Sequence, residues 1–153
     1  MAKAPATTSV PRWLVPLTLT IIVLGIGVSI YLTIAHYAEP KILACPDTGV
    51  INCAKVTTSM YSKILGIPLA VLGLAFFLGM LPFNLPAAWR STNPWIRRLR
   101  LVGSATGVLM VFYLVYTELF RLDAICLYCT SVHVLTILLF IATVLGTALT
   151  SEA

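Results

Sequence analysis

Charged residues are scarce in this chain. Only 10% of its 153 residues are Asp, Glu, Lys or Arg, whereas 59% are hydrophobic. A water-soluble domain carries about 25% charged residues, so this composition excludes an ordinary soluble fold and makes lipid the expected solvent. The formal charge of +5 does not indicate a nucleic-acid-binding protein, because the basic residues stand between apolar runs and form no stripe.

Charge is missing altogether from four stretches, at residues 14–35, 64–89, 101–117 and 129–151. A helix crosses the hydrocarbon core of a bilayer with about 20 residues, and the third stretch reaches that length only if its helix continues past Glu118. We therefore predict an all-α integral membrane protein, a four-transmembrane-helix bundle that forms a single domain over residues 1–153. The expected helices cover about 14–35, 64–83, 99–120 and 129–150, with an outer loop at 36–63.

The basic residues are distributed unevenly among the loops. Lys3 and Arg12 precede the first stretch, and the loop between the second and third contains Arg90, Arg97, Arg98 and Arg100. The other two loops have no net charge. Cytoplasmic loops of membrane proteins are enriched in Lys and Arg, so we expect a multi-pass protein with both termini in the cytoplasm. All four cysteines then face the extracytoplasmic side, periplasmic or lumenal, where disulfides form and persist.

The cysteines are few, and they fall into two pairs with different spacing. Cys126 and Cys129 form a CxxC motif at the start of the last apolar stretch. Helix N-terminal N–H groups stabilise a thiolate there, and the thiolate is the species that attacks disulfides. Cys45 and Cys53 enclose seven residues, including turn-forming Pro, Asp and Gly. A flexible loop of this kind predicts a pair that exchanges with both an outside partner and the CxxC motif.

Two other interpretations of the cysteines stay open at this point. Cys45 and Cys53 could form a structural staple only. The four cysteines could bind zinc, although structural zinc sites use repeated short C-x₂₋₄-C knuckles and only Cys126 and Cys129 have that spacing.

Polar residues near the cysteines are candidates for ligand contacts. Ser, Thr and Tyr are concentrated at residues 54–63, where their hydroxyls could hydrogen-bond a quinone carbonyl or anchor the loop at the membrane interface. His133 lies at i+4 from Cys129, on the same helical face. An ionisable residue inside a membrane helix is a functional candidate; the alternative is a hydrogen bond to a neighbouring helix. We interpret Glu118 and Asp123 as interfacial charges.

Three segments together resemble the vitamin K epoxide reductase family and its bacterial homologues over nearly the whole chain. They are C-P-D-T-G-V-I-N-C-A-K-V-T-T-S from Cys45, G-I-P-L-A-V-L-G from Gly66, and C-L-Y-C-T-S-V-H from Cys126. Their order, their spacing and the helix count agree. The resemblance implies a four-helix bundle around a quinone pocket, covered by the extracytoplasmic loop and a half-helix cap.

The resemblance also implies roles for individual residues. Cys126 and Cys129 match the active-site pair, with Cys129 nearest the quinone, and Cys45 and Cys53 match the shuttle pair. We expect Cys45 to meet the outside partner and Cys53 to meet Cys126. The residues implied to contact the quinone are Ser59, Ser62, Leu65, Leu69 and His133, where His133 replaces a tyrosine of the animal enzymes.

The function implied is that of a thiol:quinone oxidoreductase that supports disulfide bond formation. Its electron donor is an extracytoplasmic thioredoxin-like thiol protein, expected to be a separate chain, and its acceptor is a menaquinone, ubiquinone or vitamin K type quinone, with no metal and no nucleic acid involved. The alternatives are reduction of vitamin K epoxide or vitamin K quinone as the main reaction, and a non-catalytic tetraspan scaffold stapled by disulfides. A DsbB-type thiol oxidase performs similar chemistry, but its CxxC motif comes early in the chain.

Overall fold

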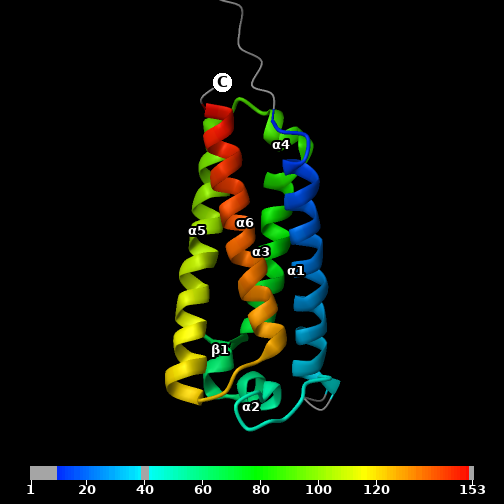
Figure 1. The fold of residues 1–153 in the computed structure, drawn as a ribbon, viewed down its shortest axis with the longest axis vertical. Coiled ribbons are helices and arrows are strands. Elements are labelled where there is room, and N and C mark those ends of the chain that lie inside the picture. The colour runs from blue at the N-terminus through cyan, green and yellow to red at the C-terminus, as the bar shows by residue number, and fades with distance from the viewer. Residues whose placement is uncertain (1–9, 39–41, 152–153) are drawn as a thin grey trace, which may run out of the picture.

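Four apolar helical segments lie side by side along the long axis of the molecule (Figure 1). The computed structural model describes residues 10–38 and 42–151. The four segments are α1 (Leu14–Tyr37), α3 (Leu69–Asn84), α5 (Pro94–Thr117) and α6 (Leu127–Ser151). The short helix α2 (Cys53–Thr58) covers one end of the bundle, and α4 (Pro86–Arg90) lies at the other end.

The helices match a membrane by length and by surface. Within the described residues, three are long and apolar enough to cross a bilayer: Leu14–Tyr37, Pro94–Leu122 and Leu127–Thr150. Helix α3 is apolar but has only 16 residues, which span about 24 Å against a hydrocarbon core of about 30 Å. The bundle also exposes large apolar side chains along its length, as lipid contact requires; among them are Val23, Leu24, Leu109, Phe112 and Leu145.

The prediction of a helix over residues 64–83 is wrong at its start, because a hairpin precedes α3. Strand β1 (Lys63–Ile64) pairs antiparallel with β2 (Ile67–Pro68). The turn between them places Leu65 and Gly66 at positive φ, 52° and 84°. These left-handed conformations are incompatible with an α-helix, so α3 begins only at Leu69.

The same apolar stretch breaks once more, at Leu85. A proline disfavours the α conformation in the residue before it, and Leu85 before Pro86 is extended, with φ −64° and ψ 154°. Buried Arg100 of α5 donates hydrogen bonds to main-chain oxygens on both sides of this break. Its guanidinium donates to the main-chain oxygens of Phe83 at 2.8 Å and Ala88 at 3.1 Å, and it lies 3.6 Å from the centre of the Trp89 ring.

The other expected helices differ from the observed ones mainly at their ends. Helix α5 begins at Pro94, after Asn93 accepts a hydrogen bond from the Trp95 N–H at 3.0 Å. It ends at Thr117, and a π-helical turn, η3 (Glu118–Leu122), continues it. Helices α1 and α6 each extend about two residues beyond the expected 14–35 and 129–150. Helix α6 therefore begins inside the CxxC motif.

Close helix packing holds the bundle together. Helix α1 contacts α3 and α6, and α6 contacts α5. The ring of Phe77, fully buried on α3, lies where a Cβ at Gly25 of α1 would stand, at 2.5 Å. Only glycine permits this approach of two helices, as is usual in membrane bundles.

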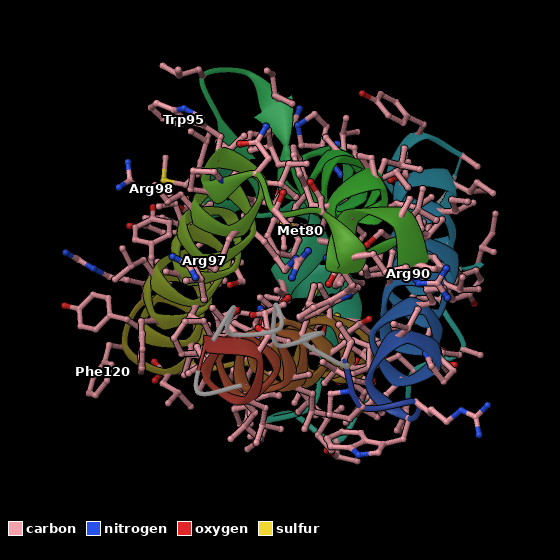
Figure 2. The ribbon with its side chains drawn as sticks, turned by 90° about the horizontal axis from the view of Figure 1, so that it is seen from above. Met80, Arg90, Trp95, Arg97, Arg98 and Phe120 are labelled. Atoms are coloured by element: carbon pink, nitrogen blue, oxygen red, sulfur yellow. A yellow bond between two sulfur atoms is a disulfide. The ribbon has the colours of Figure 1, made fainter. Side chains whose placement is uncertain are left out.

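The two ends of the bundle differ in chemistry. Figure 2, viewed onto the α4 end, shows Arg90, Arg97, Arg98 and Trp95 there. The cysteine-bearing loop and α2 lie at the opposite end (Figure 1). The predicted separation of the arginine-rich loop from the cysteines is thus a feature of the fold.

Candidate redox site

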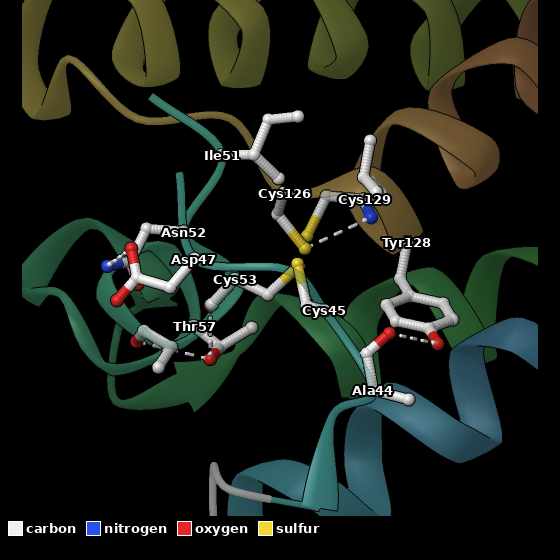
Figure 3. The surroundings of a disulfide bond; sticks show 12 residues. Ala44, Cys45, Asp47, Ile51, Asn52, Cys53, Thr57, Cys126, Tyr128 and Cys129 are labelled. Carbon is white, nitrogen blue, oxygen red and sulfur yellow. Dashed lines mark hydrogen bonds between the residues drawn. A yellow bond between two sulfur atoms is a disulfide. The ribbon is translucent and has the colours of Figure 1, made fainter. Parts of the chain in front are cut away.

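All four cysteines meet at the α2 end of the bundle (Figure 3). Cys45 and Cys53 form a disulfide, with their Cα atoms 6.1 Å apart, and Cys126 and Cys129 are free thiols. Cys53 and Cys126, 2% and 0% exposed, belong to one buried apolar cluster, and the half-buried Cys45 and Cys129 pack against it. Figure 3 shows the Cys126 side chain directed toward the disulfide.

Local hydrogen bonds shape the loop between Cys45 and Cys53. The Asp47 carboxylate accepts from the Gly49 N–H at 3.3 Å and from the Asn52 side chain at 3.2 Å. Gly49 has φ +86°, which glycine adopts without steric cost. The Asn52 side chain then caps α2 by accepting the Lys55 N–H at 2.8 Å. Cys53 is therefore the first residue of a helix and has a fixed position.

Main-chain pairing joins the residues before Cys53 to the residues before Cys126. Ile51 and Ile125 form a parallel bridge. The Asn52 N–H donates to the Ile125 oxygen at 3.1 Å, and the Ile125 N–H donates to the Val50 oxygen at 2.8 Å. Ile125, one residue before Cys126, therefore lies next to Ile51, two residues before Cys53.

Two tyrosines hold the residues before Cys45. The Tyr128 hydroxyl, inside the CxxC motif, donates to the Ala44 oxygen at 3.1 Å. The Tyr31 hydroxyl of α1 donates to the Ile42 oxygen at 2.8 Å and accepts the Ala44 N–H at 3.3 Å. The two rings meet edge to face, with centres 5.1 Å apart. Both arms of the loop are thus attached to the helices that form the site.

The CxxC motif straddles the N-terminus of α6. Cys126 lies just before the helix, and its Sγ accepts the Cys129 N–H at 3.3 Å. A hydrogen bond from the Cys129 thiol lowers the pKa of the Cys126 thiol, and this effect with those of nearby N–H groups exceeds the opposing effects of burial and of the Glu118 charge. The Cys126 thiol therefore forms its thiolate at lower pH than an ordinary cysteine does, and a thiolate is the nucleophile in disulfide exchange.

A cavity lies inside the bundle next to the CxxC motif. Helices α1, α3, α5 and α6 form its walls, and residues of α2 and the following turn η2 (Met60–Ser62) cover it. Cys129 is the only cysteine among the described residues that line it. Most of the accessible lining is apolar, which suits a flat, lipid-soluble ring.

Four of the five expected ligand contacts line this cavity: Ser59, Ser62, Leu69 and His133. The hydroxyls of Ser59 and Ser62 donate to the oxygens of Val56 and Ser59, at 2.9 and 2.7 Å, and so can accept from a ligand but not donate without rearranging. Buried His133 makes no hydrogen bond to another described residue. Its expected alternative role, pairing with a neighbouring helix, is not observed there.

Leu65 does not line the cavity, and the prediction that it does is wrong. Its side chain is 98% exposed, because the positive φ of the hairpin turn directs it away from the bundle. Glu118, interpreted from the sequence as an interfacial charge, is instead turned into the protein. Glu118 is 6% exposed, begins the π-helical turn and lines the cavity. Its position as the residue that closes an apolar run was the only signal for this in the sequence.

The arrangement leaves no zinc site among the cysteines. Two of them are bonded to each other, and the described residues contain no group of three or more His, Cys, Asp or Glu placed to hold a metal ion.

The fold and the site define an apolar helical membrane protein with a paired-cysteine redox centre beside an internal cavity. The family model for the vitamin K epoxide reductase family matches residues 16–144. The chain belongs to this family, whose members are oxidoreductases. The matched range includes all four cysteines and every residue that lines the cavity.

Proposed function

We propose that this protein is a thiol:quinone oxidoreductase that supports disulfide bond formation. Electrons pass from a reduced thioredoxin-like protein to Cys45 and Cys53, then to Cys126 and Cys129, and finally to a quinone in the cavity. The observation that supports this most directly is the graded burial of the cysteines. Cys45 is half-buried, Cys53 and Cys126 share one buried cluster, and Cys129 alone lines the cavity.

The first exchange takes place at the outer pair. A thiolate of the partner attacks the sulfur of Cys45, which breaks the Cys45–Cys53 bond and releases the Cys53 thiolate. The second thiol of the partner then displaces Cys45, and the partner leaves as a disulfide. Two electrons have entered the outer pair, and Cys45 and Cys53 are both reduced.

The second exchange connects the two pairs. The Cys53 thiolate attacks Cys126 of an oxidised CxxC motif and releases Cys129, and Cys45 then displaces Cys126 from Cys53. The products are an oxidised outer pair and a reduced inner pair, which is the combination present in the structure. Cys126 and Cys129 finally re-form their disulfide while the quinone accepts two electrons and two protons. Ser59, Ser62, Leu69 and His133 contact the quinone in this scheme.

The proposed orientation places the cysteine end outside the cytoplasm. The α4 end carries the exposed arginines Arg90, Arg97 and Arg98, and the positive-inside rule favours the cytoplasm for that end. Helix α3, continued by α4, supplies the fourth crossing of a single membrane domain over residues 1–153. Impermeant thiol labels on single cysteines introduced at Thr92 and Val50, in a cysteine-free background, test both points: only Val50→Cys should react from outside intact cells.

Mixed-disulfide trapping tests the relay. Combining Cys45→Ser with Cys129→Ser leaves Cys53 and Cys126, which should form a disulfide readily on mild oxidation. The matched control combines Cys53→Ser with Cys129→Ser and should form far less of the Cys45–Cys126 bond, because Cys45 lies at the edge of the buried cluster. Equal yields from both combinations would remove the proposed order of the cysteines.

Purified protein tests the acceptor. With a thiol donor, wild-type protein should reduce decylubiquinone or a short-chain menaquinone, and Cys129→Ser should lose this activity, whereas Ser131→Ala on the exposed side of α6 should retain it. The family's name makes vitamin K epoxide the second acceptor to offer. Turnover of the epoxide alone would replace the quinone proposal, and no turnover of any acceptor would favour a disulfide-stapled scaffold.

A further inference from the structure

Ser29 of α1 carries a hydroxyl that has no partner in the described part of the protein. The side chain is 1% exposed, and its Oγ makes no hydrogen bond there. An unpaired buried hydroxyl costs free energy, and native proteins pair nearly all such groups. Ser29 is one of the residues that line the cavity, as Cys129 is.

Other buried hydroxyls in these helices behave differently. Each donates to a main-chain oxygen three or four residues earlier in its own helix, as serine and threonine usually do inside membrane helices. They are Thr18, Ser104, Thr117, Thr136 and Thr143. The Ser29 hydroxyl makes no such bond, so its proton is not committed to the main chain of its own helix.

The surroundings of Ser29 leave room for a ligand. A Cβ built at Gly73 of α3 would lie 3.5 Å from the Ser29 Oγ, so the glycine keeps the space beside the hydroxyl open. Ser29 also lies seven residues before His36 on the same helix. It therefore lies about 10 Å deeper in the bundle than His36 does. On α6, His133 is likewise about 6 Å deeper than Cys129. Polar groups therefore occur at both ends of a mostly apolar cavity.

We propose that Ser29 donates a hydrogen bond to a carbonyl oxygen of the bound quinone ring, at the end of the cavity far from the cap. This inference rests on the proposed function, and it adds a binding residue that the sequence motifs do not contain. A quinone suits both ends of the cavity because it carries two carbonyl oxygens on opposite sides of one flat ring. The hydroxyls of Ser59 and Ser62 already donate to main-chain oxygens. The hydroxyl of Ser29 can therefore supply the hydrogen-bond donor that they do not.

Ser29→Ala separates this role from a structural one. Loss of a hydrogen bond to the ligand should weaken decylubiquinone binding about 3- to 10-fold, measured by calorimetric titration of oxidised protein without thiol donor. The unliganded variant should melt at or slightly above the wild-type temperature, because the change removes an unpaired polar group. Ser131→Ala, a serine replacement on the exposed face of α6, should bind as wild type does.

Gly73→Ala provides a second test from the opposite wall. The added methyl group occupies space beside the Ser29 hydroxyl and should also weaken decylubiquinone binding. Gly79→Ala is the matched control on the same helix, because a Cβ there meets no atom within 4 Å.

The outcomes distinguish this inference from the proposed function. If wild-type protein binds decylubiquinone and Ser29→Ala binds it equally well, the role of Ser29 is overturned while the oxidoreductase proposal stands. A lower melting temperature of unliganded Ser29→Ala with unchanged affinity would make the hydroxyl a structural group or one paired with water. If wild-type protein neither binds nor reduces any quinone, both proposals fall.

Discussion

The Tyr128 hydroxyl donates a hydrogen bond to the main-chain oxygen of Ala44, 3.1 Å away and 84 positions earlier in the chain. One partner lies between the cysteines of the CxxC motif, and the other directly precedes Cys45. This contact, with those of Tyr31, gives the outer disulfide a defined position above the inner thiols. In the proposed relay the outer pair has to leave this position during exchange, and we expect these hydrogen bonds to control how often it does so.

We predict that Tyr128→Phe makes the outer disulfide easier to reduce and slows transfer between the pairs. The replacement keeps the ring and removes only the hydroxyl that holds Ala44. Reduction of Cys45–Cys53 by a small thiol should accelerate, and turnover with quinone should fall by a factor of about 2 to 10, which corresponds to one net hydrogen bond.

The control for this prediction is Tyr113→Phe, at an exposed tyrosine near the C-terminal end of α5. It should leave both rates unchanged. Identical reduction rates in Tyr128→Phe and wild-type protein would show that the Ala44 contact does not restrain the loop.

We predict that the pKa of the Cys126 thiol lies below its ordinary value. The Cys129 thiol and neighbouring N–H groups stabilise the Cys126 thiolate and lower its pKa. The thiolate therefore persists to lower pH than the thiolate of an ordinary cysteine, and it is lost as the pH falls through the lowered pKa. Attack of the Cys126 thiolate on the Cys45–Cys53 disulfide, the reverse of the proposed transfer, should become slower over that same range.

Ultraviolet absorbance of the thiolate measures this titration in protein whose outer pair is oxidised, with Cys126→Ala as the blank. Cys129→Ala removes the first hydrogen-bond donor and should move the Cys126 midpoint to higher pH. A midpoint that does not move would mean that Cys129 has no part in stabilising the thiolate.

We predict that Glu118→Gln slows quinone reduction about 100-fold, the lower end of the range for loss of general acid or base catalysis. Glu118 is a buried carboxyl group in the wall of the cavity that Cys129 lines, and quinone reduction consumes two protons. Exchange between the cysteine pairs transfers no proton to the quinone, so trapping of the Cys53–Cys126 bond should continue.

Asp123→Asn is the matched control, since Asp123 is an exposed acid only five residues away. It should reduce quinone at the wild-type rate. Equal turnover of Glu118→Gln and Asp123→Asn in stopped-flow single-turnover measurements would exclude a proton-transfer role for Glu118.

We predict that Arg100→Ala destabilises the bundle by about 2–4 kcal/mol, because it leaves the oxygens of Phe83 and Ala88 without their buried donor. Arg100 is 3% exposed and also packs on the Trp89 ring. Unfolding of purified protein in a denaturing detergent series measures the loss. Arg97→Ala, at an exposed position on the same helix, should unfold as wild type does.

The long apolar runs were sufficient to predict three helices to within a few residues, because a run of some 20 apolar residues has few other stable states in lipid. The segment at 64–89 was harder to predict. Its hydropathy continues through Leu65 and Leu85, but the turn at Leu65 and Gly66 and the proline after Leu85 interrupt the helix. Hydropathy indicates whether water or lipid surrounds a segment, but it does not determine the backbone conformation of that segment.

The residues of the candidate site also include some that the sequence predicted and some that it did not. Motif spacing identified Cys45, Cys53, Cys126 and Cys129 as two pairs, and the CxxC motif indicated a helix N-terminus, which the structure confirms. No local pattern distinguishes Glu118 inside the cavity from Asp123 outside it, since both are acids near the end of an apolar run. The Ser29 hydroxyl has no partner among the described residues. Nothing in the sequence distinguishes it from the other helical hydroxyls, most of which bond to their own backbone.

The sequence by itself determined the apolar character of this protein's helices, the two cysteine pairs proposed to carry its redox chemistry and the end of the bundle where they lie. These properties follow from composition and spacing along the chain. Only the tertiary structure decided which sulfurs are buried together, which acid and which hydroxyl line the cavity, and where the loop is held. Those relations depend on contacts between residues far apart in the chain, such as Tyr128 and Ala44 at a separation of 84 positions, and such contacts exist only once the helices have packed.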